Sequence, residues 1–421
     1  MSKYKELIIC SILTAIIGAV VGITAGIFGQ ILHIAEEIRS EHYIFIVPFL
    51  GVAGMAMLFL YKHISPNSEQ GLNLAIAYNM GKATDEGAVK KHTHKQMLGK
   101  FPKAYAPLKL LTNLIMLFFG ASTGKEGSFA AFGASIGDYL ARITKARRYS
   151  HILLISGVAA AVSGLFQTPL GGMFFALEFT VAGVMVYSLL IPTFICSFTA
   201  YFFSKLCGYT AFCHLVSANF DINLQNISML VIASLAFGIV GRTFAVCLRN
   251  AHRIYHQKIK NRYLFILITG SVMALIFILL QGRYCGTGAN IFSGIFDKGT
   301  FNYYDFALKF IFTIVCIVAG FTGGEMMPLL TIGATLGALM ATFTGLPFEL
   351  TAAMGCVAVY ASATNTLVAP IFIGIEMFGT DAAIYIAIAC IIAYATNGKD
   401  SVYTMQGHIT KNIYRRLGQK E

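Results

Sequence analysis

The chain has 421 residues, of which 57% are hydrophobic and only 12% are charged. A soluble globular protein carries about 25% charged residues, so this composition leaves too few charges to cover a water-exposed surface. It predicts an all-α polytopic membrane protein. The net charge of +12 comes from 31 basic and 19 acidic residues. Because no zinc-finger spacing, RNA-binding aromatic motif or basic helix face is present, we assign the charge to basic cytoplasmic loops and exclude nucleic acid as a partner.

Motifs for catalysis and metal binding are missing from the sequence. The nine cysteines are scattered without a CxxC pair, and the ten histidines form no HExxH or comparable pattern. No glycine-rich phosphate loop precedes a Lys-Ser/Thr pair, and we find no catalytic pair of the kind that an intramembrane hydrolase needs. We therefore predict a protein that is not an enzyme and that uses no metal or cofactor.

Apolar runs follow one another along the whole chain. Several are only about 12 to 16 residues long, whereas a helix needs about 20 to cross the hydrocarbon core, and many contain Gly or Pro. Irregular backbone at membrane depth survives only where it is buried in protein or lines a cavity. The pattern predicts broken and tilted helices, which are typical of a transporter or channel. The runs begin near Leu7, Tyr43, Leu108, Gly127, Ile152, Pro169, Val184, Met229, Leu264, Phe306, Met327, Thr351, Ile371 and Ala382.

The placement of basic residues sets the predicted orientation. They concentrate in the polar segments 82–103, 142–148, 249–262 and 411–420. Basic loops stay on the cytoplasmic side of a membrane, so we predict a multi-pass protein with both termini in the cytoplasm. Two spans then separate the first two basic segments. The turn between these spans contains GASTGKEGS and is predicted to lie at the outer side.

The sequence contains an internal repeat. Residues 120–137 overlay residues 320–337 without a gap and share four glycines and an alanine. QTPLGGMFFALE then overlays NTLVAPIFIGIE, with Glu178 matching Glu376; these two glutamates are either structural caps or ion sites. Duplicated halves with broken helices are typical of secondary transporters. We predict two transmembrane repeats, residues 1–222 and 223–421, the second ending in a short cytoplasmic tail.

The segment GKEGSFAAFGASIG combines a sharp turn with the start of a helix. Gly124 and Gly127 allow the turn. The first N–H groups of a helix are unpaired and carry about half a positive charge, which favours an anion. Glu126 precedes this helix in an apolar setting. Its carboxylate can occupy the same N-terminus as a rival anion and leave when protonated, so it can gate the anion and carry a proton; the alternative is a simple helix cap.

The segment GGEMMPLL repeats this design in the second half. Gly323 and Gly324 make the turn, and Pro328 stands near the helix start, where its missing N–H does no harm. Glu325 is nearly alone in a long apolar stretch. A carboxylate in such a place is held neutral or used functionally, although it could also be a cap or packing partner bonded to backbone.

Two further polar residues stand near broken segments. Gln70 precedes a short helix that Gly71 opens, and its amide could donate hydrogen bonds to an anion. A loop glutamine with no special role is the competing interpretation. Tyr403, in KDSVYTMQG, could donate its hydroxyl to an anion or could serve as an interfacial aromatic anchor.

These segments resemble the CLC family of chloride channels and proton-coupled anion antiporters over nearly the whole chain. GKEGS is similar to the family motif GREGP, which makes Glu126 the external gating glutamate by resemblance. GLFQTPLGGMFFALE looks like the stretch ending in APLAGxLFxxE. GGEMMP corresponds to the family motif GxFxP. It carries Glu325 at the position that contributes to the selectivity filter in the second repeat, as in the fluoride/proton antiporter branch. RYCGTGANIF and GKDSVYTMQG also look like that branch and place Tyr403 at the anion-contacting tyrosine.

The chain departs from the family pattern at three positions. Gln70 in EQGLN replaces the serine of GSGIP. Met327 stands where the fluoride branch commonly has a threonine. Phe179, next to Glu178, occupies the position of the internal proton glutamate of chloride/proton exchangers, which speaks against their usual proton route.

The resemblance implies an all-α CLC-type inverted-repeat fold that forms homodimers in the bilayer of a bacterial inner membrane. It implies transport of small halides, with fluoride/proton antiport (fluoride export) favoured and chloride as a further substrate; the alternative is a passive chloride channel of the same fold. Glu126 and Glu325 are the predicted gating and proton-transfer residues. The predicted anion-binding residues are Gln70, Gly71, Gly124, Gly127, Glu325, Met326, Met327 and Tyr403.

Overall fold

The computed structural model describes residues 3–65, 71–76, 105–217 and 223–408, and within them the chain is almost entirely helical. Residues 71–76 form a short helix. The remaining α-helices are α1 (Lys3–Glu41), α2 (Tyr43–Ile46), α3 (Leu50–Ile64), α5 (Tyr105–Phe118), α6 (Glu126–Ile143), α7 (Ser150–Phe166), α8 (Pro169–Glu178), α9 (Leu190–Leu206), α10 (Leu224–Lys258), α11 (Arg262–Leu279), α12 (Ala289–Lys298), α13 (Asp305–Ala319), α14 (Met326–Thr344), α15 (Phe348–Thr364), α16 (Val368–Phe378) and α17 (Ala383–Asn397). Short 3₁₀ turns cover Val47–Phe49, Arg147–Tyr149 and Tyr187–Leu189, and β1 (Val181–Ala182) pairs in parallel with β2 (Gly407–His408).

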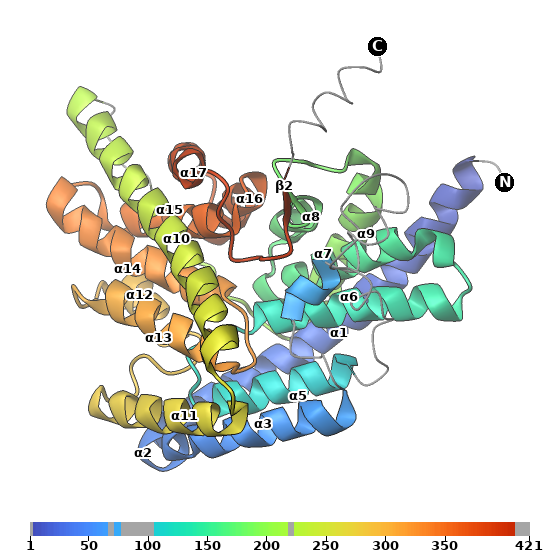
Figure 1. Cartoon of the computed structure of the whole chain (residues 1–421). Helices are drawn as coiled ribbons and strands as arrows, with labels where there is room; N and C mark the ends of the chain where they lie inside the picture. The colour runs from blue at the N-terminus through green and yellow to red at the C-terminus, as the bar shows by residue number, and fades with distance from the viewer. Residues whose placement is uncertain (1–2, 66–70, 77–104, 218–222, 409–421) are drawn as a thin grey trace.

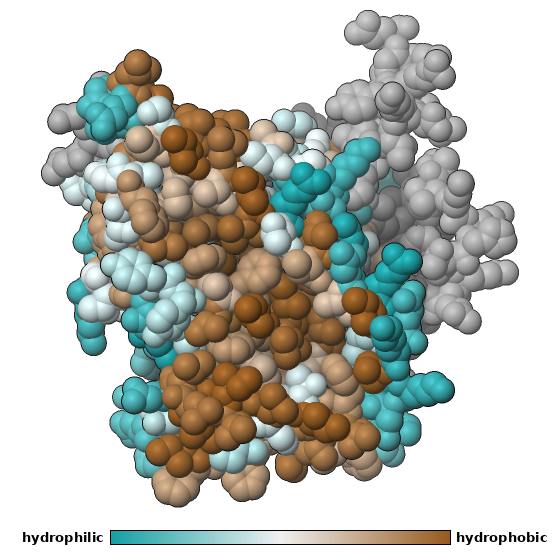
Figure 2. Space-filling model, turned by 60° about the vertical axis from the view of Figure 1, so that its left-hand side comes forward, coloured by the Kyte–Doolittle hydropathy of each residue, from teal (hydrophilic) through white to brown (hydrophobic). Residues whose placement is uncertain are grey.

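The helices differ widely in length, as the short apolar runs predict. Six spans among the described residues are long and apolar enough to cross a membrane. Five other apolar helices have only 10 to 17 residues, too few for the roughly 20 that a full crossing needs. Figure 2 shows a broad apolar surface with hydrophilic side chains toward its margins. The multi-pass membrane fold built from long and broken helices is therefore confirmed.

Helix α1 illustrates how one helix faces both lipid and protein. Its buried face includes Ile17, Val21 and Leu32. Its other face exposes large aliphatic side chains at intervals of three or four residues, which is the period of a helix surface. A charge-free exposed stripe of this kind is stable only against hydrocarbon. The exposed residues are Ile8, Ile12, Ile16, Val20, Ile23, Ile27, Ile31, Ile34 and Ile38.

The two halves of the chain pack their central helices in the same way. Helix α6 lies on α7, and α14 lies on α15 (Figure 1). A Cβ atom on Gly133 would collide with the Gly157 carbonyl, and one on Gly333 would collide with the Gly355 carbonyl. The glycines of the repeat therefore hold each pair of backbones in direct contact, a common device in membrane helix packing.

The two repeated turns meet each other at the centre of the molecule. Gly124 N donates to Gly324 O at 2.6 Å, and Gly324 N donates to Gly124 O at 2.8 Å. This reciprocal pair relates the two turns by an approximate two-fold axis, as inverted repeats require; the division at residues 222 and 223 stays a prediction. The turn of residues 120–124 is buried against its counterpart, and its predicted place toward the outer side of the membrane stays a prediction.

The matched glutamates of the repeat cap helices of the opposite half. Glu178 accepts hydrogen bonds from the backbone N–H groups of Val368 and Ala369, each at 3.0 Å. Glu376 accepts from those of Leu170 and Gly171, each at 2.9 Å. Each carboxylate thus satisfies two unpaired donors at the start of α16 or α8. The geometry favours the structural-cap interpretation over an ion site.

We predict that Glu376→Ala lowers the melting temperature of the detergent-solubilised protein. The substitution leaves two backbone N–H groups in a mostly buried site without acceptors, at a cost of about 1–3 kcal/mol for each. Glu376→Gln keeps one acceptor oxygen, so its melting temperature should lie between those of the wild type and Glu376→Ala. The exposed Asp381 offers a matched control in Asp381→Asn. Equal melting temperatures for wild type and Glu376→Ala would show that the cap does not stabilise the fold.

Candidate functional site

A small cavity lies where three helix N-termini converge. It offers about 10 Å³ to a water-sized particle, which is close to what a single water molecule occupies. The cavity is lined by Leu72, Glu126, Gly127, Ala130, Val162, Phe175, Glu325, Met326 and Tyr403. The fold thus brings together five of the residues that the sequence predicted from three distant segments.

Glu126 reaches across the repeat boundary. It is the first residue of α6 and is only 2% exposed. Its Oε2 accepts a hydrogen bond from the Met327 backbone N–H at 3.3 Å, whereas its Oε1 is buried without a partner among the described residues. We expected the carboxylate at the N-terminus of its own helix. It occupies instead the N-terminus of α14, which is the position where an anion would bind.

Glycines create the space in which Glu126 turns toward α14. A Cβ on Gly124 would lie 2.5 Å from Glu126 Oε2 and 3.0 Å from the Gly324 carbonyl oxygen. A Cβ on Gly127 would lie 2.9 Å from Gly324 Cα. Gly124 does not line the cavity and acts by its lack of a side chain.

Glu325 faces the same cavity from the second repeat. It is the N-cap of α14, but its side chain makes no capping hydrogen bond. It is partly buried, lines the cavity and interacts electrostatically with Glu126. A cap role therefore does not account for this carboxylate. Two acidic side chains from opposite repeats share a space that fits one small anion.

Tyr403 closes another side of the cavity. It is 4% exposed and its ring packs edge-on against Phe175 at 6.3 Å between centroids. This burial rules out the alternative of an interfacial aromatic anchor. The segment before it is clamped to α10, because Asp400 forms ion pairs with Arg242 at 3.1 Å and Arg249 at 2.8 Å.

The short helix of residues 71–76 contributes through Leu72. Gln70 lies outside the described residues. Gly71 does not line the cavity, but its carbonyl accepts a hydrogen bond from the Tyr105 hydroxyl at 3.1 Å. Asn73 accepts a hydrogen bond from the Met405 backbone N–H at 3.4 Å. The short helix thus contacts the segment of residues 400–405 that carries Tyr403 (the Tyr403 segment).

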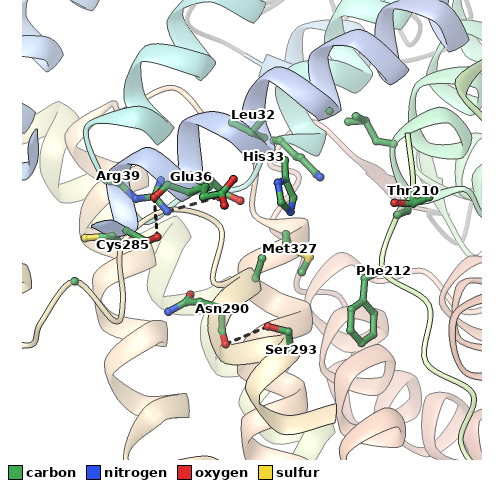
Figure 3. A pocket seen from close by; sticks show the side chains of 18 of the residues that line it. Leu32, His33, Glu36, Arg39, Thr210, Phe212, Cys285, Asn290, Ser293 and Met327 are labelled. Carbon is green, nitrogen blue, oxygen red and sulfur yellow. Dashed lines mark hydrogen bonds and ion pairs between the residues drawn. The ribbon is translucent and has the colours of Figure 1, made fainter. Parts of the chain in front are cut away.

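A larger cavity of about 510 Å³ lies nearby. It is lined by Lys125, which precedes Glu126 in the chain, and by Met327, whose backbone N–H donates to the Glu126 carboxylate. Figure 3 shows Glu36 and Arg39 on its wall, with Met327 facing the same space. Lys125 donates a hydrogen bond to the Tyr209 hydroxyl at 3.0 Å. The larger cavity thus contains both acidic and basic groups, and two of its lining residues are adjacent to Glu126 in the chain or bonded to it.

Sequence reasoning missed the polar residues that hold the two turns in place. The amide of Asn113 donates to the carbonyls of Gly124 and Thr322, each at 3.2 Å. The buried Lys309 donates to Ser122 Oγ at 2.9 Å. Both are buried polar side chains within predominantly apolar helices, which is a signal for an intramembrane role. The lining residues Ala130, Val162 and Phe175 carry no such signal.

Comparison with known proteins identifies the family. The model of the voltage-gated chloride channel family matches residues 72–398, which is more than half of the chain. The chain belongs to this family. As a CLC protein it is a membrane anion transporter and not an enzyme. The resemblance inferred from the sequence motifs is thereby confirmed.

Individual CLC proteins align with most of the chain. A chloride/fluoride channel protein of Pseudomonas syringae pv. tomato is 30% identical over 384 residues, covering 89% of this chain and 81% of the relative. The crystal structure of a CLC-type fluoride/proton antiporter shares 34% identity with a TM-score of 0.90, covering 97% of this chain and all of that one. A slow cyanobacterial chloride/proton antiporter has a TM-score of 0.79 at 18% identity, with 98% of each chain covered, and shows the shared fold alone.

We predict that Gly124→Ala slows anion transport by this CLC protein. The new Cβ would displace the Glu126 carboxylate or push the two turns apart. Anion efflux from proteoliposomes should fall severalfold while the protein stays folded. Gly294→Ala in α12 is the matched control, because its Cβ would keep ordinary contact distances of 3.4 Å. Unchanged efflux from Gly124→Ala would contradict the close packing of the Glu126 carboxylate against Gly124.

Proposed function

We propose that this CLC protein exports fluoride in exchange for protons. The observation that carries the proposal is the pair of carboxylates, Glu126 and Glu325, on one cavity that fits a single small anion. The 34% identity to a solved fluoride/proton antiporter supports the choice of fluoride, as does the match to the Pseudomonas chloride/fluoride channel protein.

Backbone N–H groups at helix N-termini form the main part of the proposed anion site. Fluoride is small and binds water strongly, so a site that strips its hydration must supply strong hydrogen-bond donors. The starts of α6 and α14 offer such donors near Gly127, Met326 and Met327, and the Tyr403 hydroxyl adds one from the opposite side. In this proposal Gln70 and Gly71 contribute the third helix start, and Gly124 keeps the entrance narrow.

Glu126 is the proposed gate and proton carrier. In the unprotonated form its carboxylate takes the Met327 N–H and keeps the anion site closed. Protonation removes the negative charge and weakens this bond, so that fluoride can take the same donor. The side chain must release its proton before the carboxylate can return to the Met327 N–H. Glu325 is the proposed second acid, which raises the electrostatic cost of holding Glu126 and fluoride charged together.

A passive chloride channel of the same fold is the alternative. Phe179 favours it, because this fully buried side chain cannot take up a proton and stacks on Phe175 with 5.5 Å between ring centroids. Glu325 argues for coupling, since a channel has no need for a second carboxylate beside its anion site.

The cellular setting is proposed on the same basis. We place the chain in a bacterial inner membrane as a homodimer with one pathway in each subunit. Both termini are proposed to be cytoplasmic, from the basic segments of the sequence. The two inverted repeats, residues 1–222 and 223–421, then enclose one transport site between them.

We predict that an outward fluoride gradient drives protons into proteoliposomes that contain this protein. Antiport couples the two fluxes, so acidification inside the vesicle should follow fluoride efflux. A fluoride electrode and an internal pH dye measure both in one sample. Empty vesicles control for leak of hydrogen fluoride through the lipid. Anion efflux without protein-dependent acidification would favour the channel.

We expect Glu126→Gln to abolish proton coupling, because an amide cannot titrate in this range. Anion flux should persist at an altered rate. Glu349→Gln is the matched control, since Glu349 is an exposed glutamate whose side chain is 48% accessible. If Glu126→Gln still exchanged anions for protons, Glu126 would not be the proton carrier.

A further inference from the structure

One buried amide in α5 bonds to both repeats. Asn113 is completely buried. Its side-chain nitrogen donates one hydrogen bond to the Gly124 carbonyl oxygen and another to the Thr322 carbonyl oxygen, each at 3.2 Å. Gly124 lies in the turn of the first repeat, and Thr322 lies in the turn of the second. A single planar group, whose two N–H bonds point in fixed directions, therefore spans the contact between the two turns.

The two carbonyls have other donors and do not depend on this amide. Gly124 O also accepts from the Gly324 N–H at 2.8 Å, and Thr322 O also accepts from the Thr123 hydroxyl at 3.5 Å. The Asn113 Oδ1 atom is itself buried without a partner among the described residues, which destabilises a fold. A leucine of similar shape would avoid this cost. The amide therefore points to a role beyond satisfying backbone carbonyls.

The matched position of the second repeat carries no such bridge. The repeat relates residues 120–137 to residues 320–337, so Asn113 corresponds to Thr313 in α13. The Thr313 hydroxyl lies 3.3 Å from the Ser122 hydroxyl and makes no other hydrogen bond to either turn within the part of the chain that the structure describes. The bridge is thus a feature of the first repeat, which also carries Glu126.

The bridge lies beside the contact that closes the proposed gate. The Glu126 carboxylate of the first repeat accepts its hydrogen bond from the Met327 N–H of the second repeat at 3.3 Å. This bond depends on how the two turns are placed relative to each other. Gly124 stands two residues before Glu126, and Thr322 stands five residues before Met327. Asn113 thus fixes the backbone close to both partners of the bond.

We propose that Asn113 is a positioning residue for the gate, which holds the two turns at the separation where Glu126 reaches the Met327 N–H. This inference rests on the proposed function. With the turns held in place, fluoride takes the Met327 N–H only after Glu126 is protonated. Without the bridge the turns shift apart, and the bond of 3.3 Å, which is already long, weakens. Fluoride then passes without a proton.

The test is Asn113→Leu, which keeps the shape of the side chain and removes both donors. Fluoride efflux and proton uptake are measured together in proteoliposomes, and their ratio is the readout. We expect the ratio of fluoride to protons to rise severalfold, the factor that corresponds to one or two lost hydrogen bonds. A purely structural role would lower both fluxes together and leave the ratio unchanged. Asn113→Thr, which copies the second repeat, should give an intermediate ratio, because one hydroxyl donates to only one turn.

Thr313→Val is the matched control, since it removes the corresponding hydroxyl of the second repeat and should keep the wild-type ratio. If Asn113→Leu does not fold, Asn113→Thr decides alone. A wild-type ratio in the folded Asn113 variants would overturn the inference while the antiport stands. A wild type that moves no protons would instead overturn the proposed antiport, and this inference with it.

Discussion

The structure depends on how helix ends are satisfied inside an apolar interior. A helix that stops at membrane depth leaves backbone N–H groups without partners, and hydrocarbon offers none. In this protein carboxylates from the opposite repeat supply the acceptors at three such ends. Glu178 serves α16, Glu376 serves α8, and Glu126 serves α14. The same kind of contact therefore stabilises the fold at two helix ends and lines the proposed transport site at the third.

The three carboxylates differ in how firmly they are held. Glu178 and Glu376 each accept two short backbone bonds, one through each oxygen. Glu126 accepts one longer bond at 3.3 Å and leaves its second oxygen buried without a partner among the described residues. A carboxylate bound in two places is a fixed cap, whereas one bound in a single place can exchange with a small anion. This difference distinguishes the two capping glutamates from Glu126, the proposed gate.

Close backbone contact makes the exchange possible. The reciprocal bonds between Gly124 and Gly324 hold the two turns together, and no side chain lies between them. Around this contact the starts of α6 and α14 converge, and the clamp from Asp400 to α10 helps to hold the Tyr403 segment in place. The resulting cavity has room for one water-sized particle.

The sequence alone determined the membrane fold, the repeat and the candidate residues Glu126, Glu325 and Tyr403, because composition, glycine register and lone acids in apolar runs are local features. It did not determine which helix end Glu126 serves, since that contact joins residues 201 positions apart. It left the roles of Glu178 and Glu376 open, and it did not show that the turn of residues 120–124 is buried against its counterpart. Contacts between distant segments decide these matters, and only the packed tertiary structure contains them.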